Sequence, residues 1–117
     1  MEKLSRRNDF KLYTLTTPVG TSTTNSRQSA TIPELAGARE IVVVVKTTDD
    51  GQAYQHHFID IGAVSYYDCF YGRVPDNNYS YVYDIIWNQT EYRVSIRFNY
   101  KGTNFNGTPK IYAVMYR

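Results

Sequence analysis

The amino-acid sequence predicts an all-β fold, an antiparallel β-sandwich that is jelly-roll-like and has about seven or eight strands. Residue types that suit a pleated, half-buried surface dominate: 12 Tyr, 12 Thr, 10 Val, 8 Ile, 5 Phe and 1 Trp stand against only 4 Leu and 6 Ala. Apolar and polar residues alternate with period two in several short segments. Turn-forming residues separate these segments at spacings of about 8 to 12 residues. Because no segment could form the helix that connects two parallel strands, the strands are expected to be antiparallel.

The length of 117 residues and the hydrophobic content of 42% predict one folded domain. Residues 1–9 are polar and charged, and we interpret them as a flexible N-terminal lead to a single sandwich domain over 10–117. The formal net charge is only +2 and is spread along the chain, which is not the signature of a polyanion-binding protein. The charged N-terminus lacks the apolar stretch of a secretory signal, so we expect synthesis in the cytoplasm without a signal peptide.

The first third of the chain changes between strand-like and polar segments. We expect a strand over 10–17, ended by Pro18 and Gly20. The run 20–29 consists almost entirely of Gly, Thr, Ser and Asn and is expected to form a surface loop or an edge strand. The segment 33–37 begins with Pro and ends with Gly, which predicts a single helical turn.

The middle of the chain predicts three further strands. The first covers 39–48, and its continuous apolar centre predicts burial on both faces. The Asp-Asp-Gly-Gln turn at 49–52 then leads into an antiparallel strand over 53–61. A third strand is expected over 64–71, followed by a loop over 72–78.

The last third contains the clearest alternation. A strand over 79–87 places its odd-numbered residues on one face, and Asn88 and Gln89 are predicted to form a two-residue hairpin turn. We expect a loop over 101–108 and a closing strand over 110–117. The strand between turn and loop predicts a buried face and a wet face, formed respectively by Tyr92, Val94, Ile96, Phe98 and Tyr100 and by Arg93, Ser95, Arg97 and Asn99.

No residue pattern predicts catalysis, a metal site or a cofactor. His56 and His57 are adjacent on a predicted strand and therefore point to opposite faces, so we expect one packed ring and one exposed ring. Cys69 is the sole cysteine and cannot form an internal disulfide or a zinc site unaided. The sequence has neither a Gly-rich phosphate loop nor a Gly-X-Ser-X-Gly elbow, and we expect a protein that is not an enzyme.

Tyrosine supplies the candidate binding residues. Twelve rings are more than a core of this size can bury with every hydroxyl satisfied, so several are expected at the surface or in a subunit interface. Tyrosines beside loops can stack on a sugar ring while Asn, Asp and Arg bind its hydroxyls. The candidates in the densest cluster are Tyr66, Tyr67, Tyr71, Arg73, Asp76, Asn77, Asn78 and Tyr79.

Residues 30–117 also resemble a known family. The stretch 32–44, Ile-Pro-Glu-Leu-Ala-Gly-Ala-Arg-Glu-Ile-Val-Val-Val, resembles the entry into the C-terminal β-domain of tail-fibre and baseplate proteins of phages and prophages. The segments 87–96 and 110–117, joined by a Gly- and Asn-rich loop, look like the terminal hairpin of these domains. The resemblance implies a receptor-binding or adhesion tip in the virion tail or tail fibre. It also implies a homotrimer that contacts other tail proteins and a bacterial surface carbohydrate, without membrane insertion.

The sequence is also compatible with two other classes of function. An aromatic-lined barrel could bind single-stranded nucleic acid through the basic row Arg93, Arg97 and Lys101, although the near-balanced charge makes this the less favoured alternative. A small glycan hydrolase would need two converging carboxylates, and Asp68 and Asp84 are the first pair to inspect.

Overall fold

The computed structural model describes residues 9–59, 64–72 and 77–117, with the backbone alone for 64–72 and for Asn77. In these residues no helix is long and apolar enough to cross a membrane. The described elements are two short 3-10 turns, η1 (Pro33–Leu35) and η2 (Asn77–Tyr79), and the strands β1 (Lys11–Val19), β2 (Arg27–Thr31), β3 (Glu40–Lys46), β4 (Tyr54–Ile59), β5 (Val64–Gly72), β6 (Tyr81–Asn88), β7 (Arg93–Lys101) and β8 (Lys110–Tyr116).

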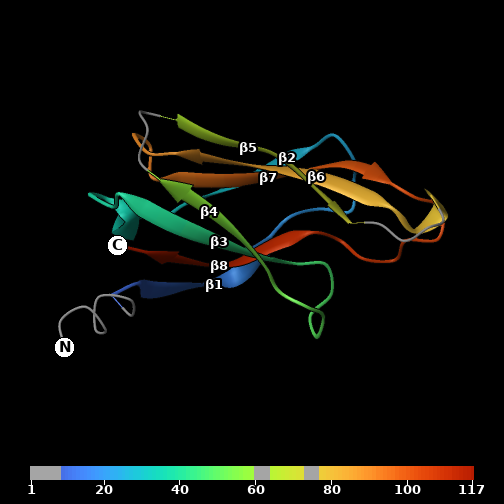
Figure 1. Cartoon of the computed structure of the whole chain (residues 1–117), viewed down its shortest axis with the longest axis horizontal. Helices are drawn as coiled ribbons and strands as arrows, with labels where there is room; N and C mark the ends of the chain where they lie inside the picture. Colours follow the sequence, from blue (N-terminus) through green and yellow to red (C-terminus); the bar gives the residue numbers. More distant parts are fainter. Residues whose placement is uncertain (1–8, 60–63, 73–76) are drawn as a thin grey trace.

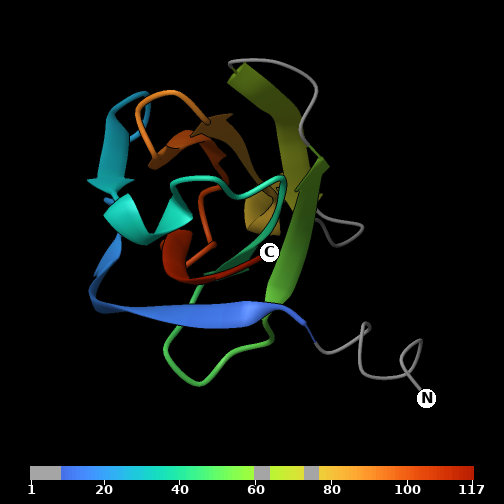
Figure 2. The same cartoon turned by 90° about the vertical axis from the view of Figure 1, so that its left-hand side faces the viewer.

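The strands form two four-stranded antiparallel sheets, which confirms the predicted all-β sandwich (Figures 1 and 2). Sheet A has the strand order β1-β8-β3-β4, and sheet B has the order β2-β7-β6-β5. The first strand pairs with the last and the second pairs with the seventh, as in a jelly roll, but β3 then pairs with its neighbour β4 and β5 with its neighbour β6, so the nesting does not continue through the middle of the chain. The polar run over 20–29 was predicted to form either a surface loop or an edge strand. Its last residues belong to β2, which is an edge strand of sheet B.

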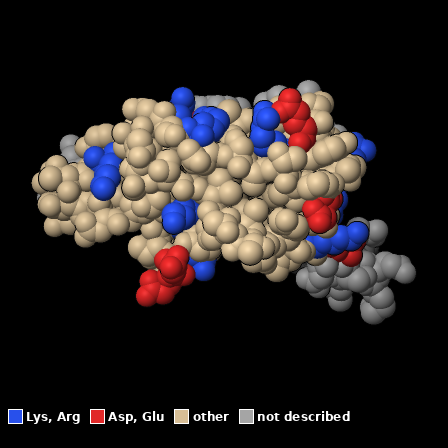
Figure 3. Space-filling model, turned by 180° about the vertical axis from the view of Figure 1, so that it is seen from behind, with Lys and Arg blue, Asp and Glu red and all other residues tan. Residues whose placement is uncertain are grey.

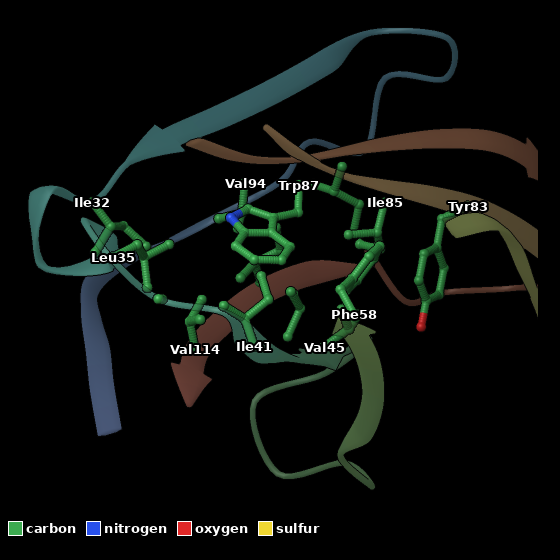
Figure 4. Close-up of a cluster of buried hydrophobic side chains, with 14 of the residues drawn as sticks. Ile32, Leu35, Ile41, Val45, Phe58, Tyr83, Ile85, Trp87, Val94 and Val114 are labelled. Carbon is green, nitrogen blue, oxygen red and sulfur yellow. The ribbon is translucent and has the colours of Figure 1, made fainter. Parts of the chain in front are cut away.

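The core lies between the sheets and is formed by every second residue of their strands (Figure 4). Trp87 of β6 is 1% exposed, and the Phe58 ring of β4 meets it edge to face across the two sheets, with the ring centres 6.5 Å apart. Leu35 of η1 is buried as well, so the single helical turn closes one end of the core. Alternation along β6 leaves its even-numbered positions on the outer face of sheet B.

Strand β3 is buried on both faces over most of its length, as its continuous apolar centre predicted. Ile41, Val43 and Val45 face the core and are inaccessible, while Val42 is only 9% exposed on the outer face of sheet A. Val44, the other outward valine, is half-buried. The central position of β3, between β8 and β4, explains this coverage.

The hairpin between β6 and β7 differs from the predicted two-residue turn. Its turn covers residues 89–92, and Tyr92 adopts a left-handed backbone with φ of 55°. Asn88 Oδ1 holds the turn by accepting hydrogen bonds from the Thr90 hydroxyl at 2.8 Å and the Glu91 amide at 3.2 Å. Tyr92 is therefore 38% exposed and does not belong to the buried face of β7, so this part of the prediction is wrong.

A β-bulge near the end of β7 changes the direction of Tyr100. Tyr83 pairs with Phe98, but the next residue back along β6, Val82, pairs with Tyr100, so Asn99 is the extra residue. Tyr100 consequently lies on the outer face of sheet B and is 46% exposed, whereas strict alternation predicted that it would be buried. The bulge therefore moves an aromatic ring from the expected core face to the surface.

Candidate functional site

A row of charged residues crosses the outer face of sheet B. Arg27 of β2 is directly opposite Arg97 of β7, and Arg97 is directly opposite Asp84 of β6. Because residues paired across antiparallel strands share a face, the three side chains meet above the same side of the sheet. Ser95 and Asn99 flank Arg97 on the same face of β7.

Asp84 is the centre of this row and binds both arginines. Arg27 Nη2 donates to Asp84 Oδ1, while Arg97 donates to Oδ2 from Nη2 at 3.0 Å and from Nε at 3.2 Å. Asn99 Nδ2 donates to Oδ2 at 3.0 Å, and its Oδ1 accepts from Arg97 Nε at 3.1 Å. Arg27 Nη1 donates to the Ser95 hydroxyl at 3.1 Å. We call Arg27, Asp84 and Arg97 the arginine clamp.

The clamp holds a fully buried carboxylate beneath two partly exposed cations. Asp84 has no exposed surface, whereas the side chains of Arg27 and Arg97 are 27% and 40% exposed. A buried carboxylate is costly unless charged and hydrogen-bonding partners replace its hydration, and here four donor groups do so. Like charges directly opposite on neighbouring strands repel, so Asp84 also permits Arg27 and Arg97 to stay adjacent.

Exposed tyrosines lie beside the clamp and at one end of the sandwich. Tyr100 follows Asn99 in β7 and stands on the same outer face of sheet B. Tyr79 ends η2 and is 47% exposed. The amide of Asn104 donates to the carbonyl of Asn78 at 2.6 Å, which fastens η2 to the loop between β7 and β8 at the end farther from the C-terminus (Figure 1).

The sequence-predicted site residues reach this region only in part. Asn78 and Tyr79 are exposed, and Asn77 begins η2. The backbone of β5 places Tyr66, Tyr67 and Tyr71 opposite Ile86, Ile85 and Val82 of β6, so Tyr71 is in one register row with Val82 and Tyr100. The side chains of these three tyrosines, and all of Arg73 and Asp76, lie outside the described residues.

Sequence reasoning missed the clamp as a unit. The sequence predicts that Arg97 lies on the wet face of its strand and that Asp84 lies on the even-numbered face of the preceding strand. Nothing in the polar run around Arg27 indicates a partner, because Arg27 and Asp84 are 57 positions apart and only the pairing of β2 with β7 brings them together. Asp68, the other carboxylate of the pair considered from sequence, lies in β5 where the register with β6 shifts, so its backbone is opposite Asp84. The side chain of Asp68 lies outside the described residues.

The histidine pair takes the predicted arrangement, one ring packed and one exposed. His56 is 2% exposed, and its Nε2 is 2.7 Å from the Tyr83 hydroxyl. Burial lowers the pKa of His56 from 6.5 to about 4. His57 faces outward and binds Glu40, and the hydrogen bond from Arg117 to Glu40 lowers the pKa of Glu40. In the described part of the chain, no group of three His, Cys, Asp or Glu side chains could hold a metal ion.

A depression opens near the C-terminal end of the sandwich, the end that faces the viewer in Figure 2. It has a volume of about 240 Å³ and lies between β1, the segment after η1 and the end of β8. Its charged groups are Lys11, Glu34 and Arg117. Arg117 binds Glu40 at 2.8 Å and covers the Phe10 ring at 4.3 Å, so its guanidinium group is already engaged within the protein.

Charged side chains of both signs are scattered over the face shown in Figure 3, without one continuous basic stripe among its described residues. Of the basic row considered from sequence, Arg93 pairs with Glu91 at 2.5 Å and Arg97 pairs with Asp84. Arg93 is therefore balanced by Glu91, whereas Arg97 shares the single carboxylate of Asp84 with Arg27. Comparison of the chain with protein-family models, with curated proteins and with solved structures gives no match.

Proposed function

We propose that this chain is a non-enzymatic recognition module that binds a glycan on the outer face of sheet B. The observation that carries the proposal is that exposed Tyr100 lies on the outer face of sheet B, the face that also carries Arg97 and Asn99. An aromatic ring offers its face to the C–H groups of a sugar, and guanidinium and amide groups bind its hydroxyls. The resemblance in sequence makes a phage tail receptor-binding or adhesion tip, which meets a bacterial surface glycan, the setting that we propose.

The rigidity of the site supports this proposal. Tyr100, Asn99 and Arg97 belong to a β-strand, and the hydrogen bonds to Asp84 fix the orientation of Arg97 and Asn99. Groups held on a strand before the ligand arrives lose little entropy on binding. The site can therefore select a sugar by the position of its hydroxyls.

The surroundings of Asp84 support a role without catalysis. A glycoside hydrolase needs two carboxyl groups that reach the scissile bond. Asp84 is fully buried, and its two oxygens accept hydrogen bonds from Arg27, Arg97 and Asn99. Its carboxylate is therefore bound within the protein and is not presented to a substrate.

Binding of single-stranded nucleic acid has weaker support. Such a surface needs a groove of cations that follows the phosphates. In this chain Arg93 and Arg97 are paired with carboxylates, and the formal net charge is only +2. Exposed aromatic rings suit both ligands, and the scarcity of unpaired cations supports the glycan over the nucleic acid.

We expect that replacing Tyr100 by alanine weakens glycan binding about 10-fold, since lost stacking on one ring costs roughly 1.4 kcal/mol. A glycan array probed with the purified chain identifies the ligand, and calorimetry then compares the wild type with Tyr100→Ala. Tyr92→Ala is the matched control, because Tyr92 is also an exposed tyrosine but precedes the other end of β7. Equal losses in both variants, or a chain that binds no glycan, would contradict the proposal.

Self-association into a homotrimer is the second part of the proposal. Leu12 and Ile59 are the most exposed large aliphatic side chains of the described residues, at 65% and 59%. The register of sheet A places both on its outer face, and Met115 and Val42 lie in the row of Leu12. A symmetric assembly would bury this apolar surface and multiply weak glycan binding by avidity.

We expect light scattering to give about 41 kDa at micromolar concentration, three times the chain mass of 13.6 kDa. Leu12→Ser should shift the mass toward the monomer because it removes apolar area from the contact. Tyr92→Ser, which removes an exposed ring from a turn, should leave the mass unchanged. A monomeric wild type would remove this part of the proposal and leave the glycan site untouched.

A further inference from the structure

The arginine clamp has a net positive charge, because among the residues whose side chains the structure describes Asp84 is the one carboxylate that pairs with its two arginines. Arg27 and Arg97 contribute two positive charges and Asp84 one negative charge, so the clamp has a net charge of +1. By contrast, the ion pair of Arg93 with Glu91 joins one cation to one carboxylate and is balanced in itself. If the clamp served only to hold the strands of sheet B together, one arginine would be enough to pair with the one carboxylate.

The exposed sides of the two guanidinium groups retain hydrogen-bonding capacity. An arginine carries five N–H donors. Arg97 uses Nε and Nη2 toward Asp84 and Asn99, and among the described residues its Nη1 has no hydrogen-bond partner. The same holds for Nε of Arg27, which binds through Nη1 and Nη2. These donors belong to side chains that are 40% and 27% exposed.

We propose that the glycan is acidic and that its carboxylate binds to Arg97 and Arg27 of the clamp while its ring stacks on Tyr100. This inference rests on the proposed glycan-binding function and names the chemical class of the ligand. A planar carboxylate matches the geometry of a guanidinium group, and the bond between them is strengthened by charge. Asp84 holds both cations in place beforehand, so the ligand does not have to order two long side chains.

The position of Asn99 connects the two halves of the proposed site. As the extra residue of the bulge it binds Asp84 and Arg97, and the residue that follows it is Tyr100. The bulge therefore places the aromatic ring on the same face of sheet B as the net positive charge of the clamp. A uronic acid has both required groups, a ring with C–H faces and a carboxylate attached to it.

The test uses tetragalacturonate and its fully methyl-esterified form, which has the same sugar rings without the charges. We expect the purified chain to bind tetragalacturonate at least 10-fold more tightly than the ester in calorimetry at fixed ionic strength. Arg97→Gln should reduce this preference to below 3-fold. Arg93→Gln removes the same charge from the same strand, where Arg93 pairs with Glu91, and should preserve the preference.

Each contrary outcome overturns a defined part of the argument. Equal affinity for the acid and the ester, or binding of neutral array glycans alone, disproves the charged ligand and leaves the glycan function standing. Displacement of tetragalacturonate by inorganic phosphate at equal concentration would show an anion site without sugar recognition. Tighter binding of an oligothymidylate that is lost in Arg97→Gln would assign this face to nucleic acid. If no glycan of any kind binds, the proposed function itself fails.

Discussion

Replacing both arginines of the clamp by methionine, Arg27→Met with Arg97→Met, is expected to lower the free energy of unfolding by about 3 kcal/mol. The double variant leaves Asp84 buried without a counter-charge, and removing the partners of a buried ion costs roughly 3–5 kcal/mol. We expect the lower end of this range because both arginine side chains are partly exposed, so water can reach the carboxylate once they are shortened. Urea unfolding measures the change.

Two controls separate this effect from lost packing. Each single variant retains one arginine on Asp84 and should cost about 1 kcal/mol, so the double loss should exceed the sum of the single losses. Adding Asp84→Leu to the double variant removes the unpaired charge and should restore most of the stability. Additive single losses, or a triple variant no more stable than the double, would show that Asp84 does not depend on the arginines.

Stability should also fall by about 3 kcal/mol between pH 7 and pH 4 through His56. Burial lowers the pKa of His56 to about 4, against an ordinary value of 6.5. Between these values the unfolded chain binds a proton that the folded chain does not, so acid favours unfolding. The stabilisation is complete above pH 6.5 and disappears as the pH falls toward 4; each pKa unit corresponds to about 1.4 kcal/mol.

Chemical unfolding at a series of pH values checks this prediction. His56→Gln retains a polar group near the Tyr83 hydroxyl but cannot be protonated, so its stability should vary little between pH 6.5 and pH 4.5. His57→Gln is the control, because it leaves the buried His56 ring in place, so the fall in stability between pH 6.5 and pH 4.5 should persist. The lowered pKa of Glu40 contributes only below its ordinary value of 4.5, where protonation removes its bond to Arg117. A wild type with constant stability from pH 7 to pH 5 would contradict the role of His56.

Local sequence pattern determined the architecture of this protein. Period-two alternation predicted the sheets, the continuous apolar centre predicted the buried β3, and the adjacent histidines predicted one packed and one exposed ring. Each of these features depends on neighbours a few positions away, because side-chain direction along a strand follows from backbone geometry. The same reasoning placed Arg97 on the polar face of β7.

Tertiary structure decided what meets on the outer face of sheet B. The bulge at Asn99 turned Tyr100 outward, and the Asn88 side chain replaced a two-residue turn by a longer one. The pairing of β2 with β7 then brought Arg27 to Asp84. Strand partners and bulges depend on the packing of the whole sandwich, since one extra residue in a strand reverses the faces of all that follow. Period-two alternation does not contain that information.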